Sequence, residues 1–290
     1  MPNAIVFGGA GFLGSHVADE LTKAGYRVTV FDMKESPYLS DGQNEIIGNI
    51  LDKDDVDYAI CGNDVVYNFA GVADIAKASE NPFKTIEINV LGNMNILGYC
   101  VENQVKRFVF ASSLYVNSKN GGFYRSSKRA CEQIIEDYHD EFGLNYTILR
   151  YGSLYGLRAN KFNWVYSILN QAIKERKITR RGDGNELREY INIKDAARYS
   201  VEILAKEFEN ECVVISGHQQ MKVKDVMEMV KEMMGGEIEL EFLKSDKVKS
   251  HYEITPYSFN PKPAKKYVGK TYYDMGQGFL ECMEEVLVRK

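Results

Sequence analysis

Two side chains that could move a proton, the Tyr124 phenol and the Lys128 ammonium, lie four residues apart in GGFYRSSKRA, residues 121–130. Residues at i and i+4 share one face of a helix, so the ammonium can lie beside the phenol. A nearby cation favours the phenolate, and lowering a tyrosine pKa from about 10 to about 7 takes roughly 4 kcal/mol. The same residues also fit an ordinary amphipathic helix whose first aromatic side chain packs on the core.

A hydroxyl group that could serve the same site is that of Ser113, the last residue of the predicted strand RFVFASS. In open α/β sheets, ligands bind at the carboxyl ends of the strands. Alternation along the strand turns the neighbouring Ser112 to the opposite face of the sheet. Either serine could instead be an exposed hydroxyl at a strand end.

Alternating strands and helices must position these side chains. The pattern predicts strands over 3–8, 27–32, 44–48, 64–70, 107–113 and 146–151, and helices over 12–25, 53–60, after Pro82, and over 124–142. Such alternation implies parallel strands joined by right-handed crossovers. The predicted fold class is therefore α/β, a Rossmann-type doubly wound parallel sheet.

The alternation becomes irregular after about residue 152. Strands are predicted in EYINI and CVVISG, on either side of a helix over 194–206. We expect a dinucleotide-binding Rossmann domain over 1–152, with return segments near 189–216. Residues 153–290 would form mainly a smaller, mixed, C-terminal substrate-binding lobe.

The first predicted strand–helix junction, GGAGFLG, carries the glycines Gly8, Gly11 and Gly14. They allow a tight turn, so that the backbone amides of Phe12 and Leu13 can meet a pyrophosphate at the helix N-terminus. A tight turn without a ligand is the alternative. The strand–turn–helix context is the one that the motif requires.

The second predicted strand ends at Asp32, eighteen residues after Gly14. A carboxylate there can accept both adenosine ribose hydroxyls and would repel a 2′-phosphate. The sequence therefore favours NAD over NADP. Lys34 is the residue that argues the other way, because it could bind phosphate.

Composition excludes several classes of protein. The 290 residues carry a net charge of −5, which gives no basic surface for nucleic acid or an anionic membrane. No stretch of about eighteen apolar residues predicts a membrane span. The five cysteines are scattered without a C-x-x-C pair. We therefore expect a cytoplasmic protein without a metal site.

The chain resembles the extended short-chain dehydrogenase/reductases, the NAD-dependent epimerase/dehydratase family that acts on nucleotide sugars. The resemblance covers nearly the whole chain and depends on motifs in the order of the family. They are GGAGFLG, Asp32, GNILD, NFAG, INVLGNMNIL, FASS, Tyr124-x-x-x-Lys128, LRYGSLYG and GDGNELREYINIKDAA.

The resemblance implies a role for each member of the set. Tyr124 would be the catalytic acid/base, Lys128 its partner and a ligand of the nicotinamide ribose, and Ser113 the third catalytic residue. Both Tyr124 and Lys128 would contact the cofactor. Ser113 and Tyr124 would also contact the substrate, as would Arg188, which matches an arginine that clamps the nucleotide diphosphate. A surface ion pair is the alternative for Arg188. Further cofactor contacts are implied for Asn49, Ile50, Ala70, Gly71 and Asn89.

Three departures from the family concern the substrate. Tyr124 follows Ser113 by only eleven positions, and Val-Tyr-Gly after the serine is replaced by Val116-Asn117-Ser118. Ser153 stands where relatives often have Asn. His251 and Tyr252 could reach the sugar or simply pack.

The resemblance leaves four kinds of function open. A nucleotide-sugar 4-epimerase would work through a transient 4-keto sugar. A 4,6-dehydratase commonly has Asp-Glu after the catalytic hydroxyl residue, where this chain has Leu114 and Tyr115. Asp32 counts against a 4-ketosugar reductase that uses NADPH, and the intact Ser–Tyr–Lys set counts against a non-enzymatic member. We expect the epimerase, with a nucleotide-diphosphate sugar as its substrate.

A homodimer is also expected by resemblance. The helices after Pro82 and Tyr124 carry apolar residues beyond one stripe, including Ile86, Val90, Leu97, Ile134 and Tyr138. The alternative is that both helices pack only on the sheet.

Overall fold

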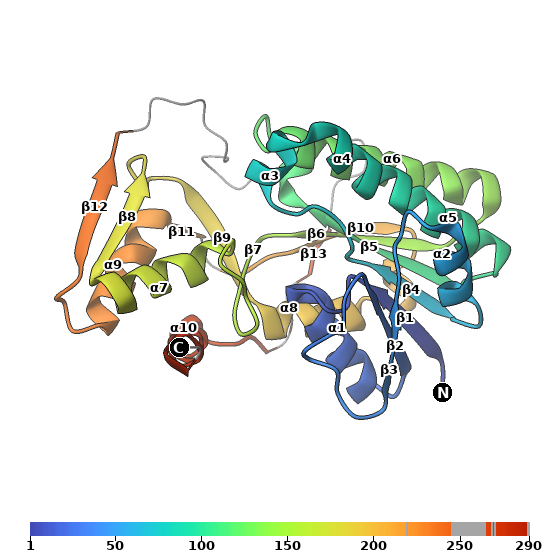
Figure 1. Cartoon of the computed structure of the whole chain (residues 1–290), viewed down its shortest axis with the longest axis horizontal. Helices are drawn as coiled ribbons and strands as arrows, with labels where there is room; N and C mark the ends of the chain where they lie inside the picture. Colours follow the sequence, from blue (N-terminus) through green and yellow to red (C-terminus); the bar gives the residue numbers. More distant parts are fainter. Residues whose placement is uncertain (219, 245–264, 268, 270, 289–290) are drawn as a thin grey trace.

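A central sheet of eight parallel strands organises the molecule (Figure 1). The computed structural model describes residues 1–218, 220–244, 265–267, 269 and 271–288. The sheet order is β13-β10-β6-β5-β4-β1-β2-β3, in which β3-β2-β1-β4-β5-β6 is the doubly wound dinucleotide-binding order. The predicted fold class is confirmed. The strands are β1 (Asn3–Phe7), β2 (Arg27–Asp32), β3 (Gln43–Ile47), β4 (Val65–Asn68), β5 (Arg107–Ser113), β6 (Tyr146–Tyr151), β10 (Glu211–Ile215) and β13 (Lys265–Lys266).

Helices cover both faces of this sheet (Figure 1). On one face, α1 (Phe12–Lys23) and α8 (Ile193–Glu202) enclose a core that includes Val17, Leu21 and Ala197. On the other face, a second core includes residues of α2 (Lys53–Ile60), α5 (Gly92–Glu102) and α6 (Gly122–Phe142). The shorter elements are α3 (Ile75–Glu80), α4 (Pro82–Ile86), the π-helical turn η1 (Glu87–Leu91), and the 3-10 turns η2 (Leu114–Asn117) and η3 (Lys206–Phe208).

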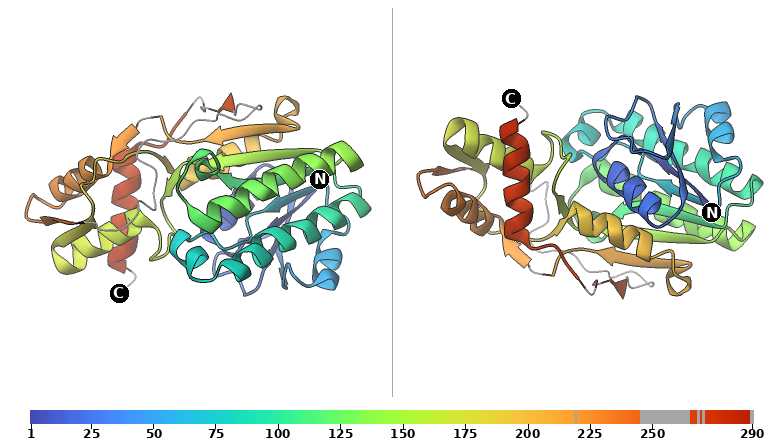
Figure 2. Two further views of the ribbon diagram at one scale, coloured as in Figure 1. Left: turned by 90° about the horizontal axis from the view of Figure 1, so that it is seen from above. Right: turned by 90° about the horizontal axis from the view of Figure 1, so that it is seen from below.

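A smaller lobe lies beside the sheet, with its own core and two small sheets (Figures 1 and 2). In one small sheet, β9 pairs parallel with β7 and antiparallel with β11, and in the other β12 pairs with β8. The lobe comprises β7 (Ser153–Tyr155), α7 (Trp164–Glu175), β8 (Lys177–Arg181), β9 (Leu187–Asn192), β11 (Gln220–Lys222), α9 (Val223–Met233), β12 (Glu239–Leu243) and α10 (Met275–Val288).

Two segments differ in detail from the prediction. The strand predicted in EYINI is β9, which pairs within the small lobe, whereas the following α8 and β10 return to the large sheet. The helix predicted over 194–206 ends at Glu202, because the chain then turns through η3 to enter β10. His251 and Tyr252 lie outside the described residues.

Arg158 joins the two lobes. It has a left-handed backbone (φ 63°), and its backbone amide donates to the Glu285 carboxylate of α10 at 3.0 Å. Its guanidinium pairs with Asp19 of α1 at 2.8 Å and lies 4.8 Å from the centre of the Tyr38 ring. Beside it, His16 Nε2 donates to the Leu157 carbonyl at 3.1 Å. The start of the small lobe is thereby anchored to α1.

His16 should make stability depend on pH. Burial lowers the pKa of His16 from 6.5 to about 4, against the effect of its hydrogen bond to Leu157. As the pH falls from about 6.5 to about 4, the unfolded chain therefore binds a proton that the folded chain does not. We expect this difference to remove about 3 kcal/mol of the free energy of unfolding over that interval.

The measurement is urea unfolding at a series of pH values for the wild type and for His16→Gln, whose amide can still donate to Leu157. The variant should lose most of this part of the acid dependence. A variant with the same dependence as the wild type would show that other groups cause it.

Candidate active site

The turn between β1 and α1 brings three backbone segments into close contact. Gly8 has a left-handed φ of +78°, and a Cβ there would lie 2.7 Å from the backbone nitrogen of Ala70. A Cβ on Gly14 would overlap the Gly8 carbonyl oxygen. At both positions the obstacle is backbone, so only glycine fits. These glycines let the strand, the helix and the loop after β4 meet at one point.

The N-terminus of α1 faces out of this turn. Gly11 caps the helix without a side-chain hydrogen bond, and the first turn carries no acidic residue. The amides of Phe12 and Leu13 therefore meet no capping side chain and no competing carboxylate. A pyrophosphate needs this arrangement, since helix N-termini bind anions through their amides and dipole. The backbone amides of the predicted residues Phe12 and Leu13 therefore fit the pyrophosphate of a dinucleotide.

Asp32 ends β2 beside the same turn. Its Oδ2 accepts from the backbone amide of Ala10 at 3.2 Å, and the side chain is half-buried. Burial raises the pKa of Asp32, opposed by hydrogen bonds from backbone amides that include Ala10 and Met33. Lys34 is exposed. The carboxylate is thus held in place where a ribose diol can reach it.

The discrimination between cofactors should depend on Asp32. We expect Asp32→Asn to reduce the preference for NAD over NADP by about tenfold or more, because the charge that repels a 2′-phosphate is lost. In the wild type, NAD affinity should weaken on acidification at a higher pH than an ordinary aspartate would give, because the pKa of Asp32 is raised. Titration of each cofactor at several pH values measures both effects. An unchanged preference in the variant would argue against this role.

Asn49 and Ile50 lie beyond the end of β3. The Asn49 side-chain oxygen accepts from the Leu51 amide at 3.0 Å, and the Asn49 amide donates to Asp55 at 2.8 Å. The oxygen of Asn49 therefore shapes the turn into α2. Ile50 is buried, and a Cβ on Gly92 would lie 2.6 Å from its Cδ1. Ile50 thus closes the sheet edge against α5.

Asn89 ties the loop after β4 to α6. Its side chain accepts from the Val72 amide at 2.7 Å and donates to the Val72 carbonyl at 3.1 Å and to Ser127 Oγ at 2.9 Å. Gly71 passes so close that a Cβ would lie 2.7 Å from Asn89 Oδ1. Asn89 lies in the π-helical turn η1, a feature frequent at functional sites. Ala70 and Gly71 are thereby held next to the glycine turn.

The three predicted catalytic residues lie where β5 ends and α6 begins. Ser113 is buried at the end of β5, and its Oγ accepts from the Tyr115 amide at 3.3 Å. The ring of Tyr115 meets that of Tyr124 edge-to-face, with 6.3 Å between centroids. Lys128 is only 6% exposed, and its Nζ lies 4.6 Å from the centre of the Phe110 ring. The short segment after Ser113 therefore places Tyr115 between the serine and the tyrosine.

Lys128 is a buried cation. Burial lowers the pKa of Lys128, and the neighbouring Cys131 and Glu132 oppose that shift. Within the described residues, Lys128 forms no salt bridge. An ammonium in this setting is available to a phenolate or to a ribose hydroxyl.

The Ser112 hydroxyl belongs to a separate hydrogen-bond network around Glu132. Its Oγ donates to Glu132 Oε1 at 2.5 Å, and Glu132 also forms a bidentate ion pair with Arg150. This geometry favours Ser113 as the serine of the site. Sequence reasoning did not find Glu132 or Arg150. The signal for Glu132 was its position one helical turn after Lys128.

A pocket of about 130 Å³ opens between Tyr115 and the small lobe. Arg188, 6% exposed, lies in β9 and donates from Nη1 to the Leu187 carbonyl at 3.0 Å. An arginine this buried does not form a surface ion pair, which was the alternative for Arg188. Arg180, paired with Glu186 at 2.5 Å, is a second arginine in the pocket that sequence reasoning missed; the basic run ITRR, which forms most of β8, was its signal. The lining residues are Tyr115, Ser153, Leu154, Trp164, Val165, Arg180, Arg188, Tyr190 and Val223.

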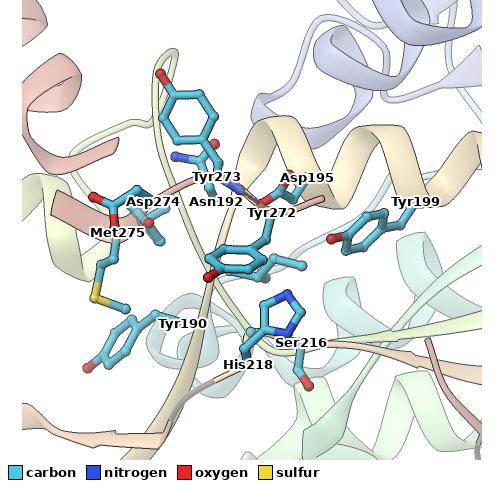
Figure 3. A pocket seen from close by; sticks show the side chains of 13 residues that line it. Tyr190, Asn192, Asp195, Tyr199, Ser216, His218, Tyr272, Tyr273, Asp274 and Met275 are labelled. Atoms are coloured by element: carbon cyan, nitrogen blue, oxygen red, sulfur yellow. Dashed lines mark hydrogen bonds between the residues drawn. The ribbon is translucent and has the colours of Figure 1, made fainter. Parts of the chain in front are cut away.

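A larger cavity, about 370 Å³, lies at the start of α8 (Figure 3). None of the predicted site residues lines it. Its polar groups hold the segment before α10: Asp195 accepts from the Tyr273 amide at 2.6 Å, and the His218 ring lies 4.6 Å from that of Tyr272. This cavity is separate from the predicted catalytic residues.

The described residues contain no group of three or more His, Cys, Asp or Glu side chains suited to a metal ion. None of the helices in the described part of the chain is long and apolar enough to cross a membrane.

The sheet order, the glycine turn and Asp32 define a Rossmann-type dinucleotide-binding protein. A model of the NAD dependent epimerase/dehydratase family matches residues 4–216, and the chain belongs to this family. The protein is thus an NAD-dependent enzyme, with NAD as its cofactor.

Two curated relatives and two solved structures illustrate the similarity. A putative UDP-glucose 4-epimerase of Methanocaldococcus jannaschii is 29% identical over 80% of this chain and 82% of its own length. A UDP-N-acetyl-alpha-D-glucosaminuronate decarboxylase of Bacillus cytotoxicus is 26% identical over 89% of this chain and 88% of its own length. The UDP-glucose 4-epimerase of Thermotoga maritima, solved with UDP-glucose, superimposes with a TM-score of 0.86 at 23% identity, covering 99% of both chains. The UDP-glucose 4-epimerase of Thermus thermophilus, solved with NAD, superimposes with a TM-score of 0.83 at 22% identity, covering 98% of this chain and 99% of that chain.

Proposed function

We propose that the protein is an NAD-dependent nucleotide-sugar epimerase that inverts C4 through a transient 4-keto sugar. The observation that supports the proposal is the Tyr124–Lys128 spacing on α6, with Tyr115 in contact with both Ser113 and Tyr124 and lining a pocket that contains two arginines. Family membership supplies the NAD dependence.

Each residue has a defined part in the proposed reaction. The glycine turn and Asp32 hold NAD, which when bound exchanges hydride reversibly with the sugar carbon. Tyr124 takes the proton of the C4 hydroxyl and returns it to the keto oxygen after the sugar has turned over. The Lys128 ammonium stabilises the phenolate, and the Ser113 hydroxyl donates to the sugar oxygen.

The substrate is proposed to be a UDP sugar. Guanidinium groups bind phosphate oxygens in bidentate fashion, and Arg188 and Arg180 both line the pocket. The curated relatives named above are both named for UDP sugars. In this proposal residues 1–152 bind NAD, and residues 153–290 supply most of the contacts to the substrate.

Dehydration is the alternative that relatives in the family represent, including a dTDP-D-glucose 4,6-dehydratase of Dictyostelium discoideum. Elimination of water needs an acid to protonate the leaving hydroxyl. The positions after Ser113 hold Leu114, which is 1% exposed, and Tyr115. Neither supplies a carboxyl group, so epimerisation is favoured.

The test is incubation of the NAD-loaded protein with UDP, GDP, CDP and dTDP sugars, followed by NMR and mass spectrometry. A C4 epimer of unchanged mass supports the proposal. Loss of water indicates a dehydratase, and gain of two hydrogen atoms indicates a reductase. No change in any sugar nucleotide would refute an enzymatic role on these substrates.

A homodimer in the cytoplasm completes the proposal. Of the residues expected at this interface, Leu97 is buried in the core, Val90, Ile134 and Tyr138 pack against the core, and only Ile86 is exposed. Other apolar side chains are exposed on the same helices: Phe83, Leu91, Met94, Phe123 and Phe142. Exposed apolar side chains on neighbouring helices are what an association surface between two copies would bury. Light scattering at micromolar concentration tests it, and a monomer would exclude the dimer.

A further inference from the structure

Glu132 lies on α6 one turn beyond Lys128 and is only 4% exposed. It accepts three hydrogen bonds: from Ser112 Oγ at 2.5 Å, from Arg150 Nε at 2.9 Å and from Arg150 Nη2 at 2.6 Å. Buried carboxylates are rare unless paired, because removing a charge from water is costly. Glu132 is thus a buried ionic group, costly to remove from water, that lies one helical turn from Lys128.

The partners of Glu132 come from two neighbouring strands. Ser112 on β5 and Arg150 on β6 are paired in register, so both side chains project on the α6 side of the sheet. Arg150 is 3% exposed, and its Nη1 has no hydrogen-bond partner among the described residues. Arg150 therefore depends on Glu132 for its counter-charge. The network connects α6, which carries Tyr124, to the strand that ends in Ser113.

We infer that Glu132 is a positioning residue for the reaction proposed above: it fixes α6 against β5 and β6 and provides a buried negative charge one turn from Lys128. The inference depends on the proposed function for the roles of Tyr124 and Lys128. A buried ion pair contributes little net stability compared with an apolar pair of the same volume. Stability alone therefore does not account for this network.

The electrostatic part follows from the groups around Lys128. Burial lowers the pKa of Lys128, and the neighbouring Cys131 and Glu132 raise it. Among the described residues, the groups that contact or act on Lys128, Glu132 or Arg150 are Cys131 and Glu136 on α6, Phe110 and Ser112 on β5, and Cys212 on β10. The uncharged Asn89 of η1 accepts a hydrogen bond from Cys131 through its backbone carbonyl.

The first experiment is Glu132→Gln in the NAD-loaded protein. Removing a negative charge lowers the pKa of every neighbouring titrating group. Lys128 should lose its proton at a lower pH, and the Tyr124 phenolate should form at a lower pH. Both limbs of the pH–rate profile for epimerisation should therefore move to lower pH, by about half a unit to one unit. An unshifted profile in a folded variant would overturn the inference.

The second variant, Arg150→Met, removes the opposite charge and predicts the opposite sign. Loss of a positive charge raises the pKa of neighbouring titrating groups, so both limbs should move to higher pH. This variant keeps the test decisive if Glu132→Gln does not fold. Shifts in the same direction for both variants would show that the effect is not electrostatic, and would overturn the inference.

A matched control is available at the other end of β5. Arg107 begins that strand and pairs with Glu209 at 2.6 Å, with side chains 8% and 18% exposed. Glu209→Gln removes a similar counter-charge away from Ser113. It should lower thermal stability and leave the pH–rate profile where it is.

A readout without turnover separates this inference from the proposed function. Tyrosinate absorbance is titrated in the NAD-loaded protein, as the difference between each chain and the same chain carrying Tyr124→Phe. Glu132→Gln should lower the midpoint of this difference. If no sugar nucleotide is epimerised but the midpoint moves, the proposed function fails and the inference stands. If epimerisation is observed and the midpoint does not move, the inference fails alone.

Discussion

Tyr124→Phe is expected to lower kcat for epimerisation about a thousandfold, within the range of a lost general acid/base. The phenylalanine keeps the edge-to-face contact with Tyr115, so packing at the start of α6 should survive. What is lost is the hydroxyl that takes and returns the sugar proton. NAD content and melting temperature should stay near those of the wild type, because the substitution alters no contact of the glycine turn.

The measurement is epimerisation followed by NMR, with NAD content determined on the same preparation. Tyr115→Phe is the matched control, because it removes the same group from the neighbouring ring and its backbone hydrogen bond to Ser113 is kept. It should cost much less in kcat. A reversed pattern, with Tyr115→Phe the inactive variant, would assign the proton transfer to Tyr115.

Much of the fold was predictable because its signals are local. The central strands include short apolar runs such as NAIVF and RFVFASS, and β1, β3, β4 and β5 are each followed by a segment of helical period. Parallel pairing follows from that alternation alone. The glycine turn was equally readable, because backbone contact at Gly8 and Gly14 leaves no other residue type.

The parts that escaped prediction depend on contacts between distant segments. The pair of Glu132 with Arg150 requires the register of β5 against β6 and the position of α6 above both. Arg180 reaches the pocket only because β8 and β9 belong to the small lobe. The same holds for β9 itself, whose pairing with β7 and β11 no local pattern specifies.

Gly14→Ala is expected to weaken NAD binding about a hundredfold or more, equivalent to about 2.7 kcal/mol. Two effects of opposite sign compete. Alanine is favoured over glycine inside a helix by about 1 kcal/mol, and Gly14 lies in the first turn of α1. Its Cβ, however, would overlap the carbonyl oxygen of Gly8 and lie 2.9 Å from Gly9 Cα. Backbone atoms cannot rotate aside, so the turn itself must move, at a cost of about 1–3 kcal/mol.

The glycine turn and the helix N-terminus would then no longer meet the pyrophosphate together, which is why cofactor affinity falls more than stability. Gly98→Ala is the control, since it lies inside α5 with only Tyr138 Oη within 4 Å, at 3.9 Å. It should gain up to about 1 kcal/mol in unfolding free energy and keep its NAD. Cofactor titration and thermal unfolding of both variants separate the two effects. If Gly14→Ala bound NAD as the wild type does, the close approach of α1 to Gly8 could not be what shapes the pyrophosphate site.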